Sequence, residues 1–221
     1  MSQPPPDIIY IIRHGEKPAD PPSPGPSDAS PPVGPPSPGP ADASSPVGPP
    51  FGVDFQGVQD QHSVLPRGWQ RSGALTGLFA PASGPPPYGL QVPATLLSPT
   101  YGGPSKTAEH RTYQTIEGLS DRLGVAIVSD FAEGQEPQLA ASVVSQNSGV
   151  VLICWEHDHI PSLASSLPTV PGTVIPQTWP GDRFDIIWVF TLVPGTTRPL
   201  YSFTQIPQQL LSGDTGTVIP A

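Results

Sequence analysis

Apolar residues are not spread evenly along the chain but gather in short continuous runs. Runs that are rich in β-branched and aromatic residues are typical of strands buried on both faces of a sheet. Five segments have this pattern and predict strands, at 7–13, 94–98, 125–130, 150–157 and 183–193. The segment 201–210 predicts a further strand at an edge of the sheet.

Between these runs, apolar residues recur at helical spacing. In 109–124 they share one face, and Gly124 is expected to cap the carboxyl end of a helix. Helices are also predicted at Pro66–Phe79, 136–146 and 160–167. Strands that alternate with helices favour an α/β fold, and we expect a three-layer sandwich with a mainly parallel central sheet and helices on both faces.

Proline and glycine interrupt this pattern in one place. The chain contains 35 prolines and 23 glycines, and many of them lie at about 18–50, where PSPGPSDASPPVGPP is followed by PSPGPADASSPVGPP. Such a composition cannot bury enough apolar surface to offset the entropy lost on ordering. We therefore expect a single domain over 1–221 that carries a low-complexity insertion, with a docking arm as the alternative role of the repeat.

Charge and cysteine content restrict the partners and the location. The formal net charge is −9 and the pI is about 4.7, which argues against nucleic acid and anionic membranes as partners. The single cysteine, Cys154, cannot form an internal disulfide, and the apolar run near the amino terminus is too short for a signal peptide or a membrane span. These features predict a cytoplasmic protein, and they leave its oligomeric state open.

Two histidines follow buried strands directly. His14 lies in Arg13-His14-Gly15-Glu16 after the first predicted strand, and His157 ends the fourth. If these strands are parallel neighbours, both imidazoles lie at one edge of the sheet, where open α/β sheets bind ligands. A neutral imidazole beside a guanidinium group is suited to phosphoryl transfer, because the first attacks phosphorus while the second binds the phosphate oxygens.

Four segments in order resemble the motifs of the histidine phosphatase superfamily, which is phosphoglycerate mutase-like in fold. They are IIYIIRHGEKP, LPRGWQRSGAL, HRTYQT and VLICWEH, and the resemblance extends from residue 7 to about 193 without the proline-rich segment. It implies that His14 is the nucleophile and becomes phosphohistidine. It further implies that Arg13 and Arg111 clamp the phosphoryl oxygens and that His157 stabilises the transferring group.

The remaining roles are less closely defined by the resemblance. Lys17 is expected to add positive charge to the phosphate site, and Glu16 is expected to orient the loop. One branch of the family takes its general acid from a carboxylate before the second histidine, where this chain offers Asp130, Glu133 and Glu136. The other branch uses the residue after that histidine, here Asp158. We favour Glu136 and keep Asp158 and Asp130 as alternatives.

The resemblance predicts hydrolysis of a phosphomonoester, with a small phosphorylated substrate or a phosphoprotein as partner and no metal or organic cofactor. The Ser and Trp-Asn that follow the first motif in the mutases are replaced here by Lys17-Pro18, which argues against mutase activity. A mutase and an inactive family member that binds a phosphorylated ligand or a protein partner remain alternatives.

Two other chemistries compete with this reading of the site. The segment 156–159 offers Glu156, His157, Asp158 and His159 as ligands for zinc, and His157 and His159 would point the same way on an extended chain. Cys154 would be a nucleophile, but a thiol inside an apolar strand is more typical of a small core residue. The loop around Trp179 is expected to line the substrate entrance.

Overall fold

The computed structural model describes residues 4–18, 50–101 and 110–221, so the predicted insertion at about 18–50 lies almost wholly outside the described residues. The strands are β1 (Pro6–Arg13), β2 (Thr95–Leu97), β3 (Ile127–Val128), β4 (Gly149–Trp155), β5 (Ile186–Leu192) and β6 (Tyr201–Pro207). The helices are α1 (Pro66–Phe79), α2 (Arg111–Leu123), α3 (Glu136–Gln146), α4 (Ile160–Ser165) and the short 3₁₀ turn η1 (Pro87–Gly89). Every strand and helix predicted from the sequence is present.

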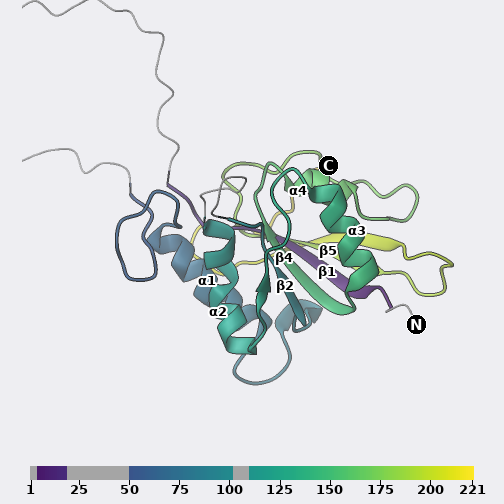
Figure 1. The fold of residues 1–221 in the computed structure, drawn as a ribbon, viewed down its shortest axis with the longest axis horizontal. Coiled ribbons are helices and arrows are strands. Elements are labelled where there is room, and N and C mark those ends of the chain that lie inside the picture. The colour runs from purple at the N-terminus through teal and green to yellow at the C-terminus, as the bar shows by residue number, and fades with distance from the viewer. Residues whose placement is uncertain (1–3, 19–49, 102–109) are drawn as a thin grey trace, which may run out of the picture.

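The six strands form one sheet in the order β3-β2-β4-β1-β5-β6 (Figure 1). Strands β3, β2, β4 and β1 are parallel to one another. Strand β5 runs antiparallel to β1, and β6 runs antiparallel to β5. The predicted α/β class is confirmed, but the sheet is mixed.

The reversal of β5 follows from the connection that precedes it. A parallel strand needs a crossover that returns the chain to the opposite edge of the sheet. Helix α4 has only six residues, and the chain after it passes Tyr201 near the amino end of β1, where Pro168 and Val170 bond to the Tyr201 backbone. The chain then returns to the carboxyl edge, where the carbonyl oxygens of Pro180 and Gly181 bind Arg13, so no crossover remains before β5. Strand β5 therefore starts beside the end of β1, with Ile187 opposite Ile12, and runs back.

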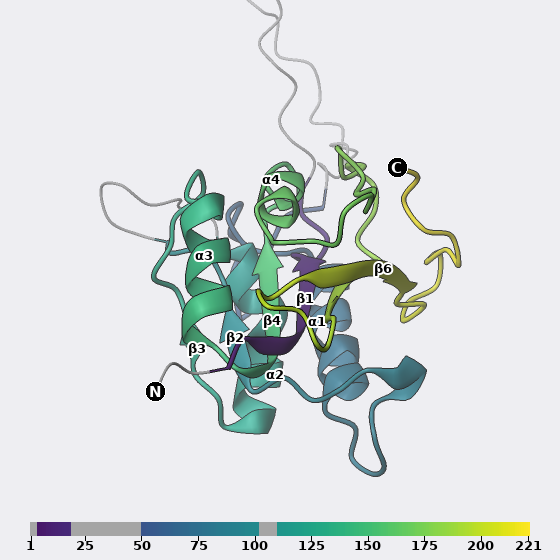
Figure 2. The same cartoon turned by 90° about the vertical axis from the view of Figure 1, so that its right-hand side faces the viewer.

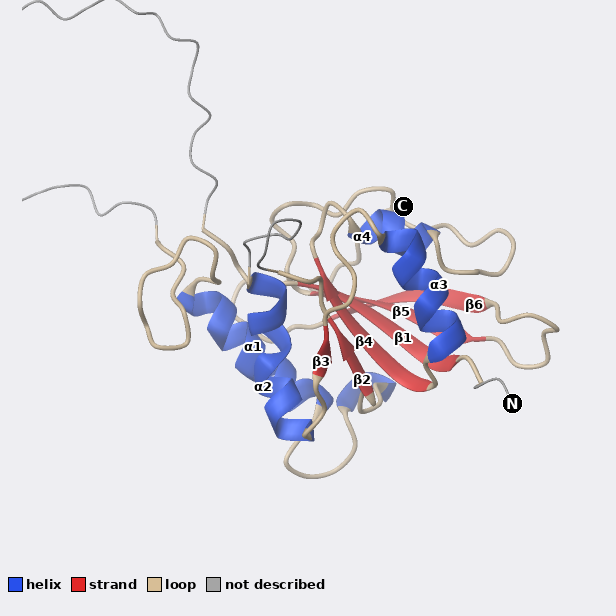
Figure 3. Cartoon of the chain, in the orientation of Figure 1, coloured by secondary structure: helices blue, strands red, loops and turns tan. Residues whose placement is uncertain are grey.

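Helices pack against both faces of this sheet (Figure 3). Side chains alternate along β1, so that Ile9 and Ile11 join a hydrophobic cluster with α3 and α4, while Tyr10 and Ile12 join a second cluster with α1 and α2. Figure 2 shows α3 and α4 together in front of the sheet. Both clusters lie against β1 and β4, which are the two central strands of the sheet.

The ends of two helices agree with the sequence signals. Helix α1 begins at Pro66, where a missing N–H costs no hydrogen bond, and it has the predicted bounds. Helix α2 ends at Leu123, and Gly124 after it adopts the left-handed conformation with φ of 66°, which confirms the predicted cap. No helix in the described part of the chain combines the length and the apolar character that crossing a membrane requires.

Candidate active site

The two predicted histidines meet at the carboxyl edge of the sheet. Strands β1 and β4 are parallel and in register, with Arg13 opposite Trp155. His14 follows directly and His157 follows two residues after Trp155, so their rings lie with centroids 6.4 Å apart and almost perpendicular. The predicted juxtaposition of His14 and His157 is therefore present.

The imidazole of His14 is fixed in one orientation. Its Nδ1 lies 2.7 Å from the carbonyl oxygen of Gly15, and because a carbonyl oxygen only accepts, Nδ1 carries the proton. The other nitrogen, Nε2, then holds the lone pair of a neutral ring. It is buried and has no hydrogen-bond partner among the described residues. Burial also lowers the pKa of His14, which favours this neutral form.

Glu156 lies between the two histidines. Its Oε1 is 3.8 Å from Nε2 of His14 and accepts a hydrogen bond from Nδ1 of His157, while Oε2 accepts from the amide of Asp158 at 2.7 Å. Burial alone would raise the pKa of Glu156, but the interactions with His14, His157 and that amide hold it well below its usual range. From the sequence, Glu156 is a candidate only as a metal ligand, although its place directly before His157 is a signal for this central position.

Arg13 is held by a loop that is distant in sequence. Its Nη1 donates to the carbonyl oxygens of Pro180, Gly181 and Arg183 at 3.2, 2.8 and 3.0 Å, and its guanidinium carbon lies 3.8 Å from the ring centroid of Phe184. Burial lowers the pKa of Arg13 to about 10, so the group still carries its charge at neutral pH. Its Nε and Nη2 are buried without a hydrogen-bond partner in the described part of the chain.

Helix α2 joins Arg111 to the loop that carries His14. Thr115 accepts a hydrogen bond from the amide of Gly15 at 2.7 Å and donates to the carbonyl oxygen of Arg111 at 2.6 Å. Arg111 itself is buried, and its Nη2 donates to the carbonyl oxygen of Gln61 at 2.8 Å. The Arg-x-x-Gln-Thr segment thus positions the first turn of α2 against the loop after β1.

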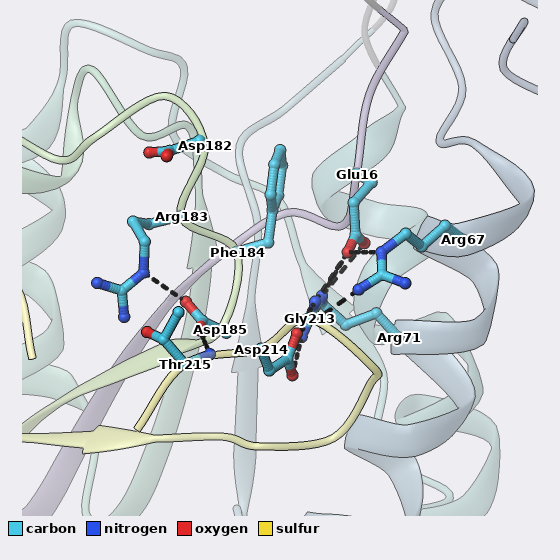
Figure 4. Close-up of a pocket in the computed structure, with 10 residues that line it drawn as sticks. All are labelled: Glu16, Arg67, Arg71, Asp182, Arg183, Phe184, Asp185, Gly213, Asp214 and Thr215. Carbon is cyan, nitrogen blue, oxygen red and sulfur yellow. Dashed lines mark hydrogen bonds and ion pairs between the residues drawn. The ribbon is translucent and has the colours of Figure 1, made fainter. Parts of the chain in front are cut away.

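A cavity of about 340 Å³ is lined by Phe184 together with several charged side chains (Figure 4). Its arginines are all paired with carboxylates: Arg67 and Arg71 with Glu16 at 3.0 and 2.8 Å, and Arg183 with Asp185 at 2.7 Å. A phosphate group would have to compete with these carboxylates. The contacts of Glu16 agree with the expectation that it orients the loop.

The candidate acids occupy different surroundings. Glu136 is buried, and its Oε1 accepts from the indole of Trp155 at 3.0 Å and from the amide of Gly134 at 2.9 Å. Asp158 has a side chain that is 78% exposed, with Oδ1 at 3.5 Å from Nε2 of His157. Asp130 is exposed. The choice of Glu136 remains a prediction.

Two further predicted residues have less specific surroundings. Lys17 is half-buried in the loop after His14, and Glu133 is half-buried before α3. Their roles also remain predictions.

The zinc ligands suggested by the sequence are not brought together as a set. His159 turns toward α3, where its Nδ1 pairs with Glu136 at 3.2 Å, so it does not share a site with His157. Within the described residues the one group with metal-ligand spacing is instead His14, Glu156 and His157, whose donor atoms all lie within 4.8 Å of one another.

Comparisons of the chain with protein-family models, with curated proteins and with solved structures find no match.

Proposed function

We propose that the chain is a phosphatase that hydrolyses phosphomonoesters through a phosphohistidine intermediate on His14. The observation that carries the proposal is the buried Nε2 of His14, whose lone pair is fixed by the bond from Nδ1 to Gly15. Beside it, Arg13 follows the same strand and keeps two buried N–H groups without a partner among the described residues. A nucleophile next to such donors is suited to an anionic electrophile.

In the first step, Nε2 of His14 attacks phosphorus while Arg13, Arg111 and His157 stabilise the charge on the phosphoryl oxygens. The N–P bond forms as the ester P–O bond breaks, and the leaving oxygen takes a proton from a carboxylic acid. In the second step, water attacks phosphorus, the N–P bond breaks and the lone pair returns to Nε2. The carboxylate from the first step removes the proton of that water.

We assign the acid to Glu136. Its side chain is buried and is anchored through one oxygen, Oε1, by Trp155 and Gly134. The imidazole of His159 lies 3.2 Å from the same oxygen, and we therefore assign the transferred proton to the other oxygen, Oε2. Trp155 lies in β4 directly opposite Arg13, the residue before His14. Through its bond to Trp155, Glu136 is therefore attached to the strand beside the one that carries the nucleophile. Asp158, beside His157, is the alternative.

The same proposal covers the mainly parallel three-layer fold of the family, a cytoplasmic location and a small phosphorylated substrate or phosphoprotein. The helices on both faces of the sheet support the fold, although β5 and β6 run antiparallel. A mutase would use the same phosphohistidine, and an inactive homologue would only bind the phosphorylated ligand. Hydrolysis of a phosphomonoester distinguishes a phosphatase from both.

The test is hydrolysis of p-nitrophenyl phosphate and a panel of phosphorylated metabolites with a metal chelator present. We expect turnover by the wild type and none by His14→Ala, and a rapid quench should trap an acid-labile phosphoenzyme. His62→Ala, which removes an exposed histidine, is the matched control and should retain the activity. Equal turnover by wild type and His14→Ala would reject the mechanism, and no turnover at any pH would favour the binding protein.

A further inference from the structure

We propose that His14, Glu156 and His157 form a binding site for one Zn²⁺ ion, and that zinc bound there inhibits the enzyme. The inhibition rests on the phosphatase activity proposed above, whereas the binding does not. The site differs from the set at 156–159 that the sequence suggested, because it joins the loops after two different strands.

The spacing of the three side chains fits a small tetrahedral ion. Donor atoms on such an ion, with bonds of about 2.1 Å, lie roughly 3.4 Å apart. Nε2 of His14 and Oε1 of Glu156 are 3.8 Å apart, and all three donor atoms lie within 4.8 Å of one another. Changes of up to about 1.4 Å in these separations, within reach of side-chain rotation, therefore bring the set to the required distances.

The donor chemistry also suits zinc. Two imidazoles and one carboxylate leave a fourth position for water, a combination found in zinc sites with three protein ligands. Nε2 of His14 is the second observation that points to a ligand, since the side chain is 1% exposed and this nitrogen has no hydrogen-bond partner in the described part of the chain. The ring is already oriented by its bond to the carbonyl of Gly15, as is usual for histidines that bind metals.

Binding of the ion changes the bond between Glu156 and His157. In the metal-free site, Nδ1 of His157 donates to Glu156. To coordinate the ion through Nδ1, the neutral ring of His157 takes its other tautomer, with the proton on Nε2, which lies 3.5 Å from the carboxylate of Asp158. Arg13 lies close enough to Glu156 to interact with its charge and opposes a second cation, so we expect weaker binding than at a structural zinc site with four protein ligands.

Zinc and substrate exclude each other at His14. The lone pair of Nε2 cannot coordinate the ion and attack phosphorus at the same time. A zinc-loaded molecule therefore has no nucleophile, and inhibition should follow occupancy of the site and be reversed by a chelator.

The binding experiment uses the full chain without a histidine tag. Zn²⁺ is titrated in competition with a chromophoric chelator, and Co²⁺ is used as a spectroscopic substitute whose visible absorption reports tetrahedral geometry. We expect one ion per chain and a loss of affinity of more than about 100-fold in His14→Ala and in Glu156→Ala. His159→Ala is the matched control and should bind as the wild type does, with circular dichroism to check that each variant is folded.

The activity experiment separates this inference from the proposed function. Turnover in chelator that falls in proportion to zinc occupancy supports both. Turnover in chelator with no zinc binding, or with binding that survives in His14→Ala but is lost in His159→Ala, overturns the zinc site and leaves the phosphatase intact. Zinc binding at the three residues by a protein that shows no turnover in chelator supports the site and overturns the phosphohistidine mechanism.

Discussion

The backbones of Gly15 and Gly68 lie in contact, at the point where the first turn of α1 meets the loop that carries His14. A Cβ atom on Gly15 would lie 2.9 Å from Cα of Gly68, and a Cβ atom on Gly68 would lie 2.8 Å from the carbonyl oxygen of Glu16. Only two residues without side chains allow this approach. The same contact lets the amide of Leu65 donate to Glu16 at 2.8 Å, which ties the loop to the start of the helix.

We therefore expect Gly68→Ala to move the loop and to destabilise the protein. The added methyl group meets Cβ of Val64 and the backbone of Glu16, and neither can rotate away, so the cost in unfolding free energy is about 1–3 kcal/mol. Gly73→Ala is the matched control in the same helix, because a Cβ atom there has no neighbour within 4 Å. It should raise the unfolding free energy by about 0.5–1 kcal/mol through helix propensity.

Urea unfolding of both variants, together with their turnover of p-nitrophenyl phosphate, checks this prediction. Gly68→Ala should lose stability and activity together, and Gly73→Ala should keep its activity. Equal stability of the two variants would show that the contact between Gly15 and Gly68 is not restrictive.

The identity of the general acid is tested by varying the leaving group. Protonation matters little for p-nitrophenolate, which is a stable anion, and matters greatly for an alkyl alcohol. We expect Glu136→Gln to lower kcat/KM for an alkyl phosphate by about 100-fold or more while p-nitrophenyl phosphate is affected much less. Asp158→Asn should lower kcat/KM for both substrates by the same small factor. The reverse pattern between the two variants would assign the acid to Asp158.

The centre of the site could be predicted because it depends on local patterns. The apolar run before His14 and the one before His157 identify two buried strands, and the ends of parallel neighbours meet at one edge. The helix Pro66–Phe79 and the cap at Gly124 were equally local and equally accurate.

The surroundings of the site could not be predicted because they depend on contacts between distant residues. Arg13 is bound by backbone carbonyl oxygens of Pro180 and Gly181, and backbone acceptors have no sequence signature. The direction of β5 depends on the path of the chain after α4, which carries no periodic pattern. His159 belongs to an α-helical N-terminus and not to an extended chain, so the alternation expected of a strand does not apply to it.

Acid should weaken the attachment of the C-terminal segment to α1. Arg71 pairs with Asp214 at 2.8 Å, and both side chains are buried. Burial alone would raise the pKa of Asp214, but the bonds from Arg71 and from the amides of Leu211 and Leu210 lower it. A carboxyl group whose pKa is lower in the folded state stabilises the protein above its unfolded value of about 3.9, and this stabilisation is lost as the pH falls through the folded value.

Asp214→Asn should therefore cost about 2 kcal/mol of unfolding free energy at pH 6, and this difference from the wild type should shrink steadily below about pH 4. Urea unfolding measured from pH 6 to pH 3 gives both quantities. Asp121→Asn, on the exposed side of α2, serves as the charge-matched control and should show no such convergence. A difference that stays constant with pH would mean that the ion pair with Arg71 does not depend on the charge of Asp214.

Cys154 should be inert in the folded protein. Its side chain is wholly buried in β4, and burial raises the pKa of the thiol despite an opposing hydrogen bond with Thr115. Iodoacetamide should therefore label the native chain only after unfolding in urea, whereas an added thiol in Ser145→Cys, on the exposed side of α3, should react at once. Cys154→Ala should keep the turnover and lose about 1 kcal/mol of stability. Loss of turnover in a folded Cys154→Ala would instead indicate that the thiol takes part in the reaction.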